Sequence, residues 1–293
     1  MSIKINFNGK IQEEAEISAL DHGFLFGDSV YEVICTFNNQ LCFADKHLKR
    51  LRNSASGIEL KVPYSDERFM REIARAVAVA ENEESYVRIV VTRGVGEIDI
   101  DPSSCERPNV LIYVTPVKPY PSTYYENGID VALVTVKRNA REALNPGIKT
   151  GNYLNNVLAK MEANRLGAKD ALMLNPWGYL TECTTSNFFF ARDGVLMTPS
   201  LDCGILAGIT REIVIQLARE NGFVVEEGQW PQEELEKADE AFITGTVKRV
   251  LPVTQLDNRP IGDGKPGPMT RKLMRLYEGL LQGLHGKVEQ LRK

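Results

Sequence analysis

The sequence has few of the residues that build disulfide frameworks and metal sites. Its five cysteines are scattered, odd in number, and form no Cys-x-x-Cys pair, and its three histidines lie far apart along the chain. A disulfide framework or a zinc knuckle needs paired cysteines or cysteines and histidines at short, regular intervals. We therefore expect neither kind of framework and no metal site.

Long apolar runs and an excess of positive charge are also absent. The formal net charge is −4, whereas a nucleic-acid surface is usually basic. No uninterrupted apolar run reaches the length needed to span a bilayer, and the N-terminal MSIKINFNGK lacks the apolar core of a signal peptide. We therefore expect a cytoplasmic protein with neither nucleic-acid nor membrane partners.

The length and composition that remain are those of a globular protein of two domains. The chain has 293 residues, of which 43% are hydrophobic and 25% charged. The stretch from Thr115 to Gly128 is rich in proline and has little apolar periodicity, which predicts a linker. We place an N-terminal α/β domain at 1–118, the linker at 119–129 and a C-terminal α/β domain at 130–293.

Strands and helices alternate in the predicted secondary structure. The β-branched and aromatic run from Val30 to Phe37 predicts a strand, and Asn152 to Leu166 predicts a helix. Thr210 is expected to cap a further helix that ends at Asn221. The side chains expected to face inward from the Asn152 helix are Leu154, Val157, Leu158 and Met161.

A lysine just before this helix is the first candidate for chemistry. Lys149 lies in the segment GIKTGNYLNN, between Ile148 and a Gly-Asn-Tyr turn. Such a lysine is usually a solvated surface charge. Its amine can instead form a Schiff base with the aldehyde of pyridoxal phosphate (PLP), if partial burial and a nearby cation favour loss of its proton.

An acid on the loop after the helix is the second candidate. Glu182 lies in the segment GYLTECTTSN, where small hydroxyl residues allow a flat ligand to approach closely. An ordinary solvated loop acid is the simpler interpretation. A carboxylate beside the pyridine nitrogen of PLP would keep that nitrogen protonated and the ring an electron sink.

Three further elements are candidates for holding a phosphate group. Arg50 lies on a basic helix face, which is more often merely solvated. The segment Leu206 to Thr210 reaches a predicted helix N-terminus, where backbone N–H groups attract anions. The Gly245-Thr246 turn follows a predicted buried strand and offers a second set of N–H donors.

Several ordered motifs together resemble one protein family. The matching segments are Asp21 to Asp28, the Arg50 helix, the Lys149 segment, Glu182 to Asn187, Gly208 to Arg211 and Thr244 to Thr246. Over nearly its whole length the chain resembles the class IV (fold type IV) PLP-dependent aminotransferases. The resemblance implies an α/β (α+β) fold of two domains with the cofactor at the domain interface, a homodimer, and ping-pong transfer of an amino group between amino acids and 2-oxo acids.

The resemblance also implies a role for each candidate residue. Lys149 would carry the Schiff base and shuttle the substrate proton, and Glu182 would pair with the pyridine nitrogen. Tyr153 would hydrogen-bond the cofactor O3′, and Leu206 would pack on the ring. The residues that would hold the phosphate are Arg50, Ile209, Thr210 and Thr246.

The substrate is less well defined by the motifs. Tyr31 and Val33, in the run Tyr-Glu-Val, resemble the D-amino acid aminotransferases, whereas Thr92 to Pro102 resembles the branched-chain enzymes. The arginine and histidine that the best-known D-amino acid enzymes have after Thr-Arg-Gly are missing here. Lys248 and Arg88 could bind a substrate carboxylate instead, although Lys248 could equally face solvent.

We therefore expect a D-amino acid aminotransferase acting on D-alanine or D-glutamate, with Tyr31, Val33, Arg88 and Lys248 binding substrate. The alternative is an L-branched-chain aminotransferase. Aminodeoxychorismate lyase activity, or a non-catalytic binding protein on the same fold, is less favoured.

Overall fold

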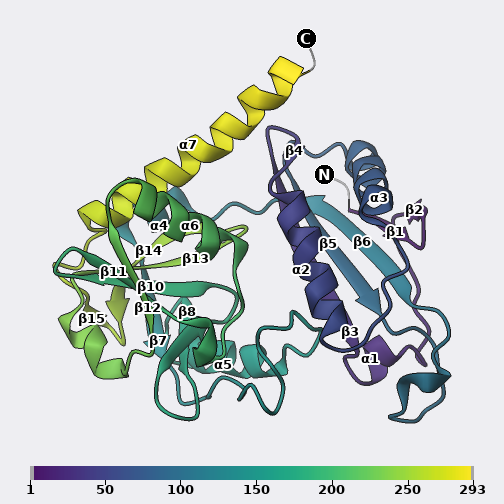
Figure 1. The fold of residues 1–293 in the computed structure, drawn as a ribbon, viewed down its shortest axis with the longest axis horizontal. Helices are drawn as coiled ribbons and strands as arrows, with labels where there is room; N and C mark the ends of the chain where they lie inside the picture. The colour runs from purple at the N-terminus through teal and green to yellow at the C-terminus, as the bar shows by residue number, and fades with distance from the viewer. Residues whose placement is uncertain (1–2, 292–293) are drawn as a thin grey trace. The chain divides into compact units, whose positions relative to one another are not determined.

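The computed structural model describes residues 3–291, which divide into two compact units (Figure 1). Within the described chain, unit 1 contains residues 3–118, 148–152 and 284–291, and unit 2 contains residues 119–147 and 153–283. Each unit has its own sheet and its own buried apolar core.

Unit 1 is built on a six-stranded antiparallel sheet in the order β2-β1-β6-β5-β3-β4. Helices α2 and α3 supply the rest of its core, and α2 packs along β3 (Figure 1). Its elements are β1 (Lys4–Phe7), β2 (Lys10–Gln12), α1 (His22–Leu25), β3 (Ser29–Phe37), β4 (Gln40–Leu41), α2 (Ala44–Ser56), α3 (Asp66–Ala80), β5 (Ser85–Thr92), the 3₁₀ turn η1 (Pro102–Ser104) and β6 (Asn109–Pro116).

Strand β3 divides its side chains between the two faces of this sheet. Val30 and Ile34 lie in the core with the helices, and Glu32 between them contacts α2. Because side chains alternate along a strand, Tyr31 and Val33 point to the opposite face. The predicted strand at Val30 to Phe37 is therefore confirmed, and its alternation separates two sets of polar contacts.

Unit 2 is built on a nine-stranded mixed sheet. Strand β9 pairs with both β8 and β10, so the strands β10-β13-β14-β7-β8-β9 form a closed ring. Its elements are α4 (Ser122–Asn127), β7 (Ile129–Leu133), α5 (Leu154–Arg165), β8 (Asp170–Leu174), β9 (Leu180–Cys183), β10 (Asn187–Arg192), β11 (Val195–Pro199), η2 (Leu201–Cys203), α6 (Ile209–Glu220), β12 (Val224–Gly228), η3 (Gln232–Lys237), β13 (Glu240–Gly245), β14 (Arg249–Leu256), β15 (Arg259–Pro260) and the first part of α7 (Pro268–Leu291).

The division into units differs from the predicted domain boundaries in two places. Residues 119–129, expected to be a linker, contain α4, and Tyr124 and Tyr125 pack against the core of unit 2. The lysine segment 148–152, expected in the C-terminal domain, belongs to unit 1. Its backbone is tied to β3, because Tyr31 N donates to Lys149 O at 3.0 Å and Gly151 N donates to Ser29 O at 2.8 Å.

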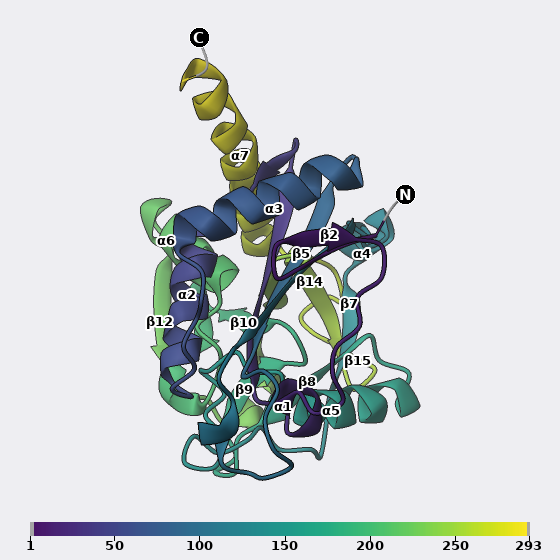
Figure 2. The same ribbon diagram turned by 90° about the vertical axis from the view of Figure 1, so that its right-hand side faces the viewer.

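The prediction of which side chains of α5 face inward was wrong. Its large apolar side chains are 46–68% exposed, and these are Leu154, Val157, Leu158 and Met161. Ala159 and Ala163 are fully buried instead, where α5 packs against β7 and β8 (Figure 2). Small side chains allow the helix backbone to approach the sheet closely. The side of the helix on which a residue lies, and not the size of its side chain, therefore decides whether it is buried.

Candidate functional site

Lys149 contacts the aromatic ring of Tyr31 in unit 1. Its Nζ donates to Tyr31 Oη at 3.2 Å and lies 4.3 Å from the ring centroid. The backbone is fixed from the other side, because Lys149 N donates to Ser54 Oγ on α2 at 3.1 Å. The lysine side chain thus lies against a ring that is only 4% exposed, and it is not an ordinary solvated surface charge.

Arg88 contacts the same ring. Its Cζ lies 3.9 Å from the Tyr31 ring centroid, a cation–π distance. Arg88 is paired in register with Val33 on β3 and with Tyr113 on β6. Burial raises the pKa of Tyr113, although the Arg88 cation opposes the rise. Arg88 therefore lies on the face of the sheet that carries Tyr31, and Tyr113 is a neighbour that the sequence analysis had not identified.

Arg50 forms a buried ion pair on the opposite face of β3. Its Nε and Nη2 donate to the two carboxylate oxygens of Glu32, at 2.6 and 2.9 Å, and His47 Nδ1 lies 2.8 Å from Glu32 Oε2. Burial by itself raises the pKa of Glu32, but Arg50 and then His47 outweigh it and lower that pKa to about 2. Burial lowers the pKa of His47, despite the neighbouring carboxylate.

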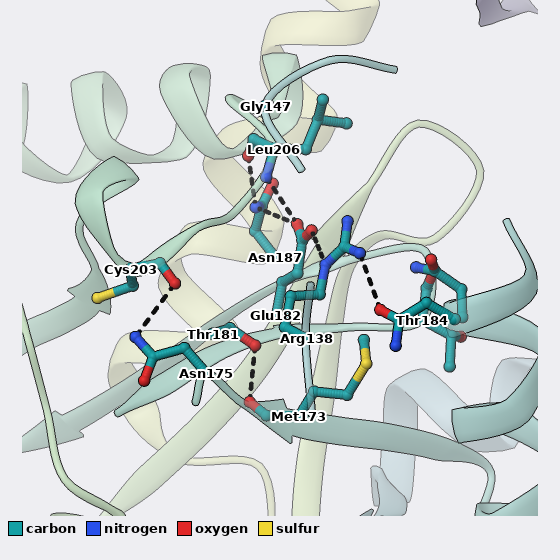
Figure 3. A network of polar contacts seen from close by, with 12 residues as sticks. Arg138, Gly147, Met173, Asn175, Thr181, Glu182, Thr184, Asn187, Cys203 and Leu206 are labelled. Carbon is teal, nitrogen blue, oxygen red and sulfur yellow. Dashed lines mark hydrogen bonds and ion pairs between the residues drawn. The ribbon is translucent and has the colours of Figure 1, made fainter. Parts of the chain in front are cut away.

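Glu182 lies at the centre of a polar network in unit 2 (Figure 3). It stands on strand β9 and not on a loop as predicted. Its Oε1 accepts from Arg138 Nε at 3.1 Å, and its Oε2 accepts from Leu206 N at 3.1 Å and from Asn187 Nδ2 at 3.2 Å. A cation and two N–H donors compensate the buried carboxylate and hold it in one orientation.

Arg138 is a site residue that the sequence analysis missed. Besides Glu182 it contacts α5, because its Nη1 donates to Asn155 Oδ1 at 3.1 Å. It follows β7 in an irregular segment with no periodicity and no glycine motif, so no local signal distinguishes it from a surface arginine. Only the strand pairing of β7, β8 and β9 brings it beside Glu182.

Two turns in unit 2 present backbone N–H groups. Helix α6 begins at Ile209 with Gly208 as its N-cap, and no side chain caps it, so Thr210 lies inside the helix and is not its cap as predicted. A Cβ at Gly208 would lie 1.9 Å from Asn187 Oδ1, so a side chain does not fit there. Thr246 lies in the turn between β13 and β14. A helix N-terminus can bind an anion such as a phosphate, and the Thr246 turn is the second candidate for this role.

Tyr153 and Leu206 also belong to unit 2. Tyr153 is the N-cap residue of α5, and its carbonyl accepts from Val157 N at 2.9 Å. Leu206 contributes two backbone contacts to the Glu182 network, its N–H to Glu182 and its carbonyl to Asn187 Nδ2 at 2.9 Å. Leu206 therefore fixes the carboxylate, in addition to the ring-packing role that the resemblance implies.

Lys248 does not present a cation to a substrate. Its side chain is buried, and its Nζ donates to Asp170 Oδ2 at 2.8 Å, Thr185 Oγ1 at 2.8 Å and Ser186 Oγ at 2.6 Å. An ammonium group has three N–H donors, and these three contacts use them all. This geometry corrects the prediction that Lys248 binds a substrate carboxylate. The neighbouring Arg249 is paired with Glu278 at 2.6 Å.

The part of the chain that the structure describes contains neither a metal cluster nor a membrane-spanning helix. Among the side chains of residues 3–283, no group of three or more histidine, cysteine, aspartate or glutamate residues is arranged to hold a metal ion. No helix in that part of the chain has both the length and the apolar character needed to cross a membrane.

Comparisons with known proteins agree with this architecture. The family model described as amino-transferase class IV matches residues 29–256. A putative branched-chain-amino-acid aminotransferase of Methanocaldococcus jannaschii is 38% identical over 95% of this chain and 96% of its own. A D-alanine aminotransferase of Bacillus licheniformis is 34% identical over 92% of this chain and 94% of its own.

Solved structures of branched-chain aminotransferases have the same fold. The Escherichia coli enzyme superimposes with a TM-score of 0.92 at 29% identity, covering 96% of this chain and 95% of that one. The T.th. enzyme, solved with pyridoxamine 5'-phosphate, superimposes with a TM-score of 0.91 at 32% identity over 96% and 94% of the two chains. The resemblance deduced from the motifs is confirmed, and the chain belongs to the class IV aminotransferase family, with the α+β architecture of fold type IV.

Proposed function

We propose that this aminotransferase binds PLP through Lys149 and Glu182. The observation that carries the proposal is the Glu182 carboxylate, which is buried among Arg138, Asn187 and the Leu206 N–H. A buried carboxylate of this kind can pair with a protonated ring nitrogen. It is not a solvated surface acid, because its burial is compensated by specific partners. When bound, PLP supplies an electron sink for negative charge that develops at the substrate α-carbon.

The remaining residues would bind the cofactor or move the proton of the substrate α-carbon. Lys149 Nζ would hold PLP covalently, and its free amine would take up the proton lost by the substrate α-carbon and deliver it to the cofactor carbon C4′. Tyr31 Oη, already 3.2 Å from this nitrogen, orients it. Ile209, Thr210 and Thr246 bind the phosphate at the two N–H turns, with Arg50 as a further contributor, while Tyr153 bonds the cofactor hydroxyl and Leu206 packs on its ring.

The substrate that we propose is a branched-chain L-amino acid, with a 2-oxo acid as its partner. The expectation of a D-amino acid was based on the Tyr31-Glu32-Val33 run and on Arg88 and Lys248 as carboxylate-binding cations. The Lys248 ammonium group is instead occupied by Asp170 and two hydroxyl groups. The M. jannaschii relative and the solved neighbours carry branched-chain names. Arg88 remains to bind the carboxylate, beside the apolar surfaces of Val33 and Tyr31.

A D-amino acid such as D-alanine or D-glutamate is the second candidate. The Tyr31-Glu32-Val33 run favours it, and so does 34% identity to the B. licheniformis D-alanine aminotransferase. The lyase activity and the non-catalytic binding protein are outcomes of the tests below. We also propose that the protein is located in the cytoplasm and is a homodimer. Sedimentation equilibrium measures the oligomeric state.

The first experiment tests the cofactor assignment. The purified protein is incubated with PLP, reduced with borohydride and digested, and the peptide that carries the reduced cofactor is identified by mass spectrometry. We expect a yellow protein with the modification on Lys149, and none in Lys149→Ala. Modification of another lysine, or a colourless protein after PLP is added, would overturn the assignment.

The second experiment tests the substrate. The PLP-loaded protein is mixed, in separate single-turnover reactions, with L-leucine, D-alanine and D-glutamate, and loss of the yellow absorbance is followed. We expect L-leucine to bleach it and the D-amino acids to react more slowly. Bleaching by a D-amino acid alone would establish the second candidate, and no reaction with any of them would favour the lyase or a binding protein.

A further inference from the structure

Lys248 is the centre of a buried polar cluster that the catalytic roles above do not use. It is 8% exposed and lies in the turn between β13 and β14. Its three donor contacts reach Asp170 at the start of β8, and Thr185 and Ser186 in the connection between β9 and β10. One side chain thus links three segments that are far apart in sequence.

The cluster contains a true ion pair. Burial by itself would favour the neutral amine of Lys248, but the Asp170 carboxylate outweighs it and raises the pKa of the lysine. Burial likewise opposes the charge on Asp170, and Lys248 and the Thr184 hydroxyl lower the pKa of that carboxyl nonetheless. Both groups are therefore charged at neutral pH, and each compensates the burial of the other.

Further contacts of Asp170 and of Asn156 fix the same connection. Asp170 Oδ1 accepts from Thr184 Oγ1 at 2.6 Å and from Thr184 N at 3.3 Å. Asn156 Nδ2 on α5 donates to Thr184 O at 2.7 Å. A Cβ at Gly245 would lie 3.3 Å from Thr185 O, so the two turns approach each other backbone to backbone.

The two turns adjoin the groups that we assign to opposite ends of PLP. Residues 184–186 connect Glu182, assigned to the ring nitrogen, with Asn187, which holds its carboxylate. Thr246, assigned to the phosphate, is two residues before Lys248. Because the ring and the phosphate belong to one molecule, the two protein segments would bind both only if they keep a spacing within its reach.

We propose that Lys248 and Asp170 are positioning residues, whose ion pair holds the Thr246 turn against the 184–186 connection and thereby sets the affinity for PLP. The proposal depends on the proposed PLP function. Neither residue is assigned a contact with the cofactor. Their effect is transmitted through Thr185, Ser186 and the backbone of the turn.

The experiment compares PLP affinity with stability in the same variants. Apo protein is titrated with PLP, the dissociation constant and the rate of PLP release are measured by absorbance, and the melting temperature of the apo protein is recorded. We expect Lys248→Met and Asp170→Asn each to weaken PLP binding by roughly 10- to 100-fold, as second-layer partners commonly do. Ser186→Ala, which removes one acceptor and leaves both charges, should show a smaller effect in the same direction.

A control separates positioning from general destabilisation. Leu235→Ala empties a buried position on η3 in the apolar core of unit 2, and it should lower the melting temperature while leaving PLP affinity within about twofold. The double variant Lys248→Met/Asp170→Asn should recover melting temperature but not PLP affinity, because an uncharged pair no longer strands a buried charge.

Unchanged PLP affinity in Lys248→Met, Asp170→Asn and Ser186→Ala would overturn the proposal and leave the pair a merely structural one. If a charge variant does not fold, Ser186→Ala decides alone. Failure of the proposed function would look different, because the unsubstituted protein would then not become yellow or bind PLP at all.

Discussion

The Lys149 ammonium group and the Tyr31 hydroxyl are 3.2 Å apart, and the same ammonium lies 4.3 Å from the centroid of the Tyr31 ring. Arg88 also contacts this ring, 3.9 Å from its centroid. Two cations thus share one buried aromatic side chain. The ring fixes where both lie, so Tyr31 connects the proposed Schiff-base lysine with the proposed carboxylate-binding arginine.

Removing the hydroxyl of Tyr31 should slow proton transfer without preventing cofactor binding. Tyr31→Phe keeps the ring and removes the hydroxyl, and with it the Oη contact to Lys149. We expect PLP still to be trapped on Lys149 by borohydride, and the single-turnover rate with the preferred amino acid to fall by about tenfold or more, because the nitrogen is less well oriented. Tyr31→Leu should be slower still, and equal rates in all three proteins would show that the ring and its hydroxyl have no part in the reaction.

Substitution of Arg88 should weaken substrate binding more than it lowers turnover. Arg88 lies on β5 opposite Val33 and is held over the Tyr31 ring. Because we assign it to the substrate carboxylate, Arg88→Ala should raise KM for the amino acid and for the 2-oxo acid by roughly 10- to 100-fold, as expected for loss of a charged contact of about 1.5–3 kcal/mol. Arg88→Lys keeps the charge and loses the paired N–H donors, so it should give an intermediate KM. A fall in kcat at unchanged KM would point to a role in the chemical step instead.

The buried triad of Glu32, His47 and Arg50 makes stability depend on pH. The folded-state pKa of Glu32 is about 2, compared with an ordinary value of 4.5. A lowered folded-state pKa stabilises the fold above pH 4.5, and this stabilisation is lost as the pH falls from 4.5 toward 2. The displacement corresponds to about 3 kcal/mol for this fully buried side chain.

Glu32→Gln should reveal this contribution. At pH 7 its free energy of unfolding should be lower than that of the unsubstituted protein by about 3 kcal/mol, and the difference should narrow as the pH is lowered from about 5 to about 3. Chemical denaturation at a series of pH values measures both curves. A difference that stays constant over this range would mean that Glu32 has an ordinary pKa in the folded protein.

The sequence predicted strand β3 and helices α5 and α6 close to their observed bounds, and local signals mark other elements as well. Ser65 accepts from Arg68 N at the start of α3, and the paired asparagines Asn38 and Asn39, both at positive φ, turn β3 into β4, as such turn residues predict. The family motifs led to Lys149 and Glu182 because short glycine and hydroxyl patterns flank them.

What the sequence did not reveal depends on contacts between distant segments. Lys248 was expected near a substrate, but its partner Asp170 lies 78 positions earlier and no local pattern connects the two. Arg138 and Glu182 are 44 positions apart and meet only through strand pairing. Residues 148–152 belong to unit 1 because they form hydrogen bonds to β3. These hydrogen bonds cannot be deduced from the order of residues along the chain.

Helix α5 provides a test of burial against side-chain size. Ala163 is fully buried in a cluster that includes Ala132 on β7 and Ala171 on β8, whereas Met161, expected to be inward, is 50% exposed. Ala163→Leu should therefore destabilise the protein by about 1–3 kcal/mol, because a packed interface does not accept extra methylene groups without strain. Met161→Gln is the matched control on the exposed face and should change the free energy of unfolding by no more than about 0.5 kcal/mol. Urea denaturation of the two variants measures both effects, and a larger loss in Met161→Gln than in Ala163→Leu would show that the large apolar side chains of α5, and not its alanines, are the ones buried in solution.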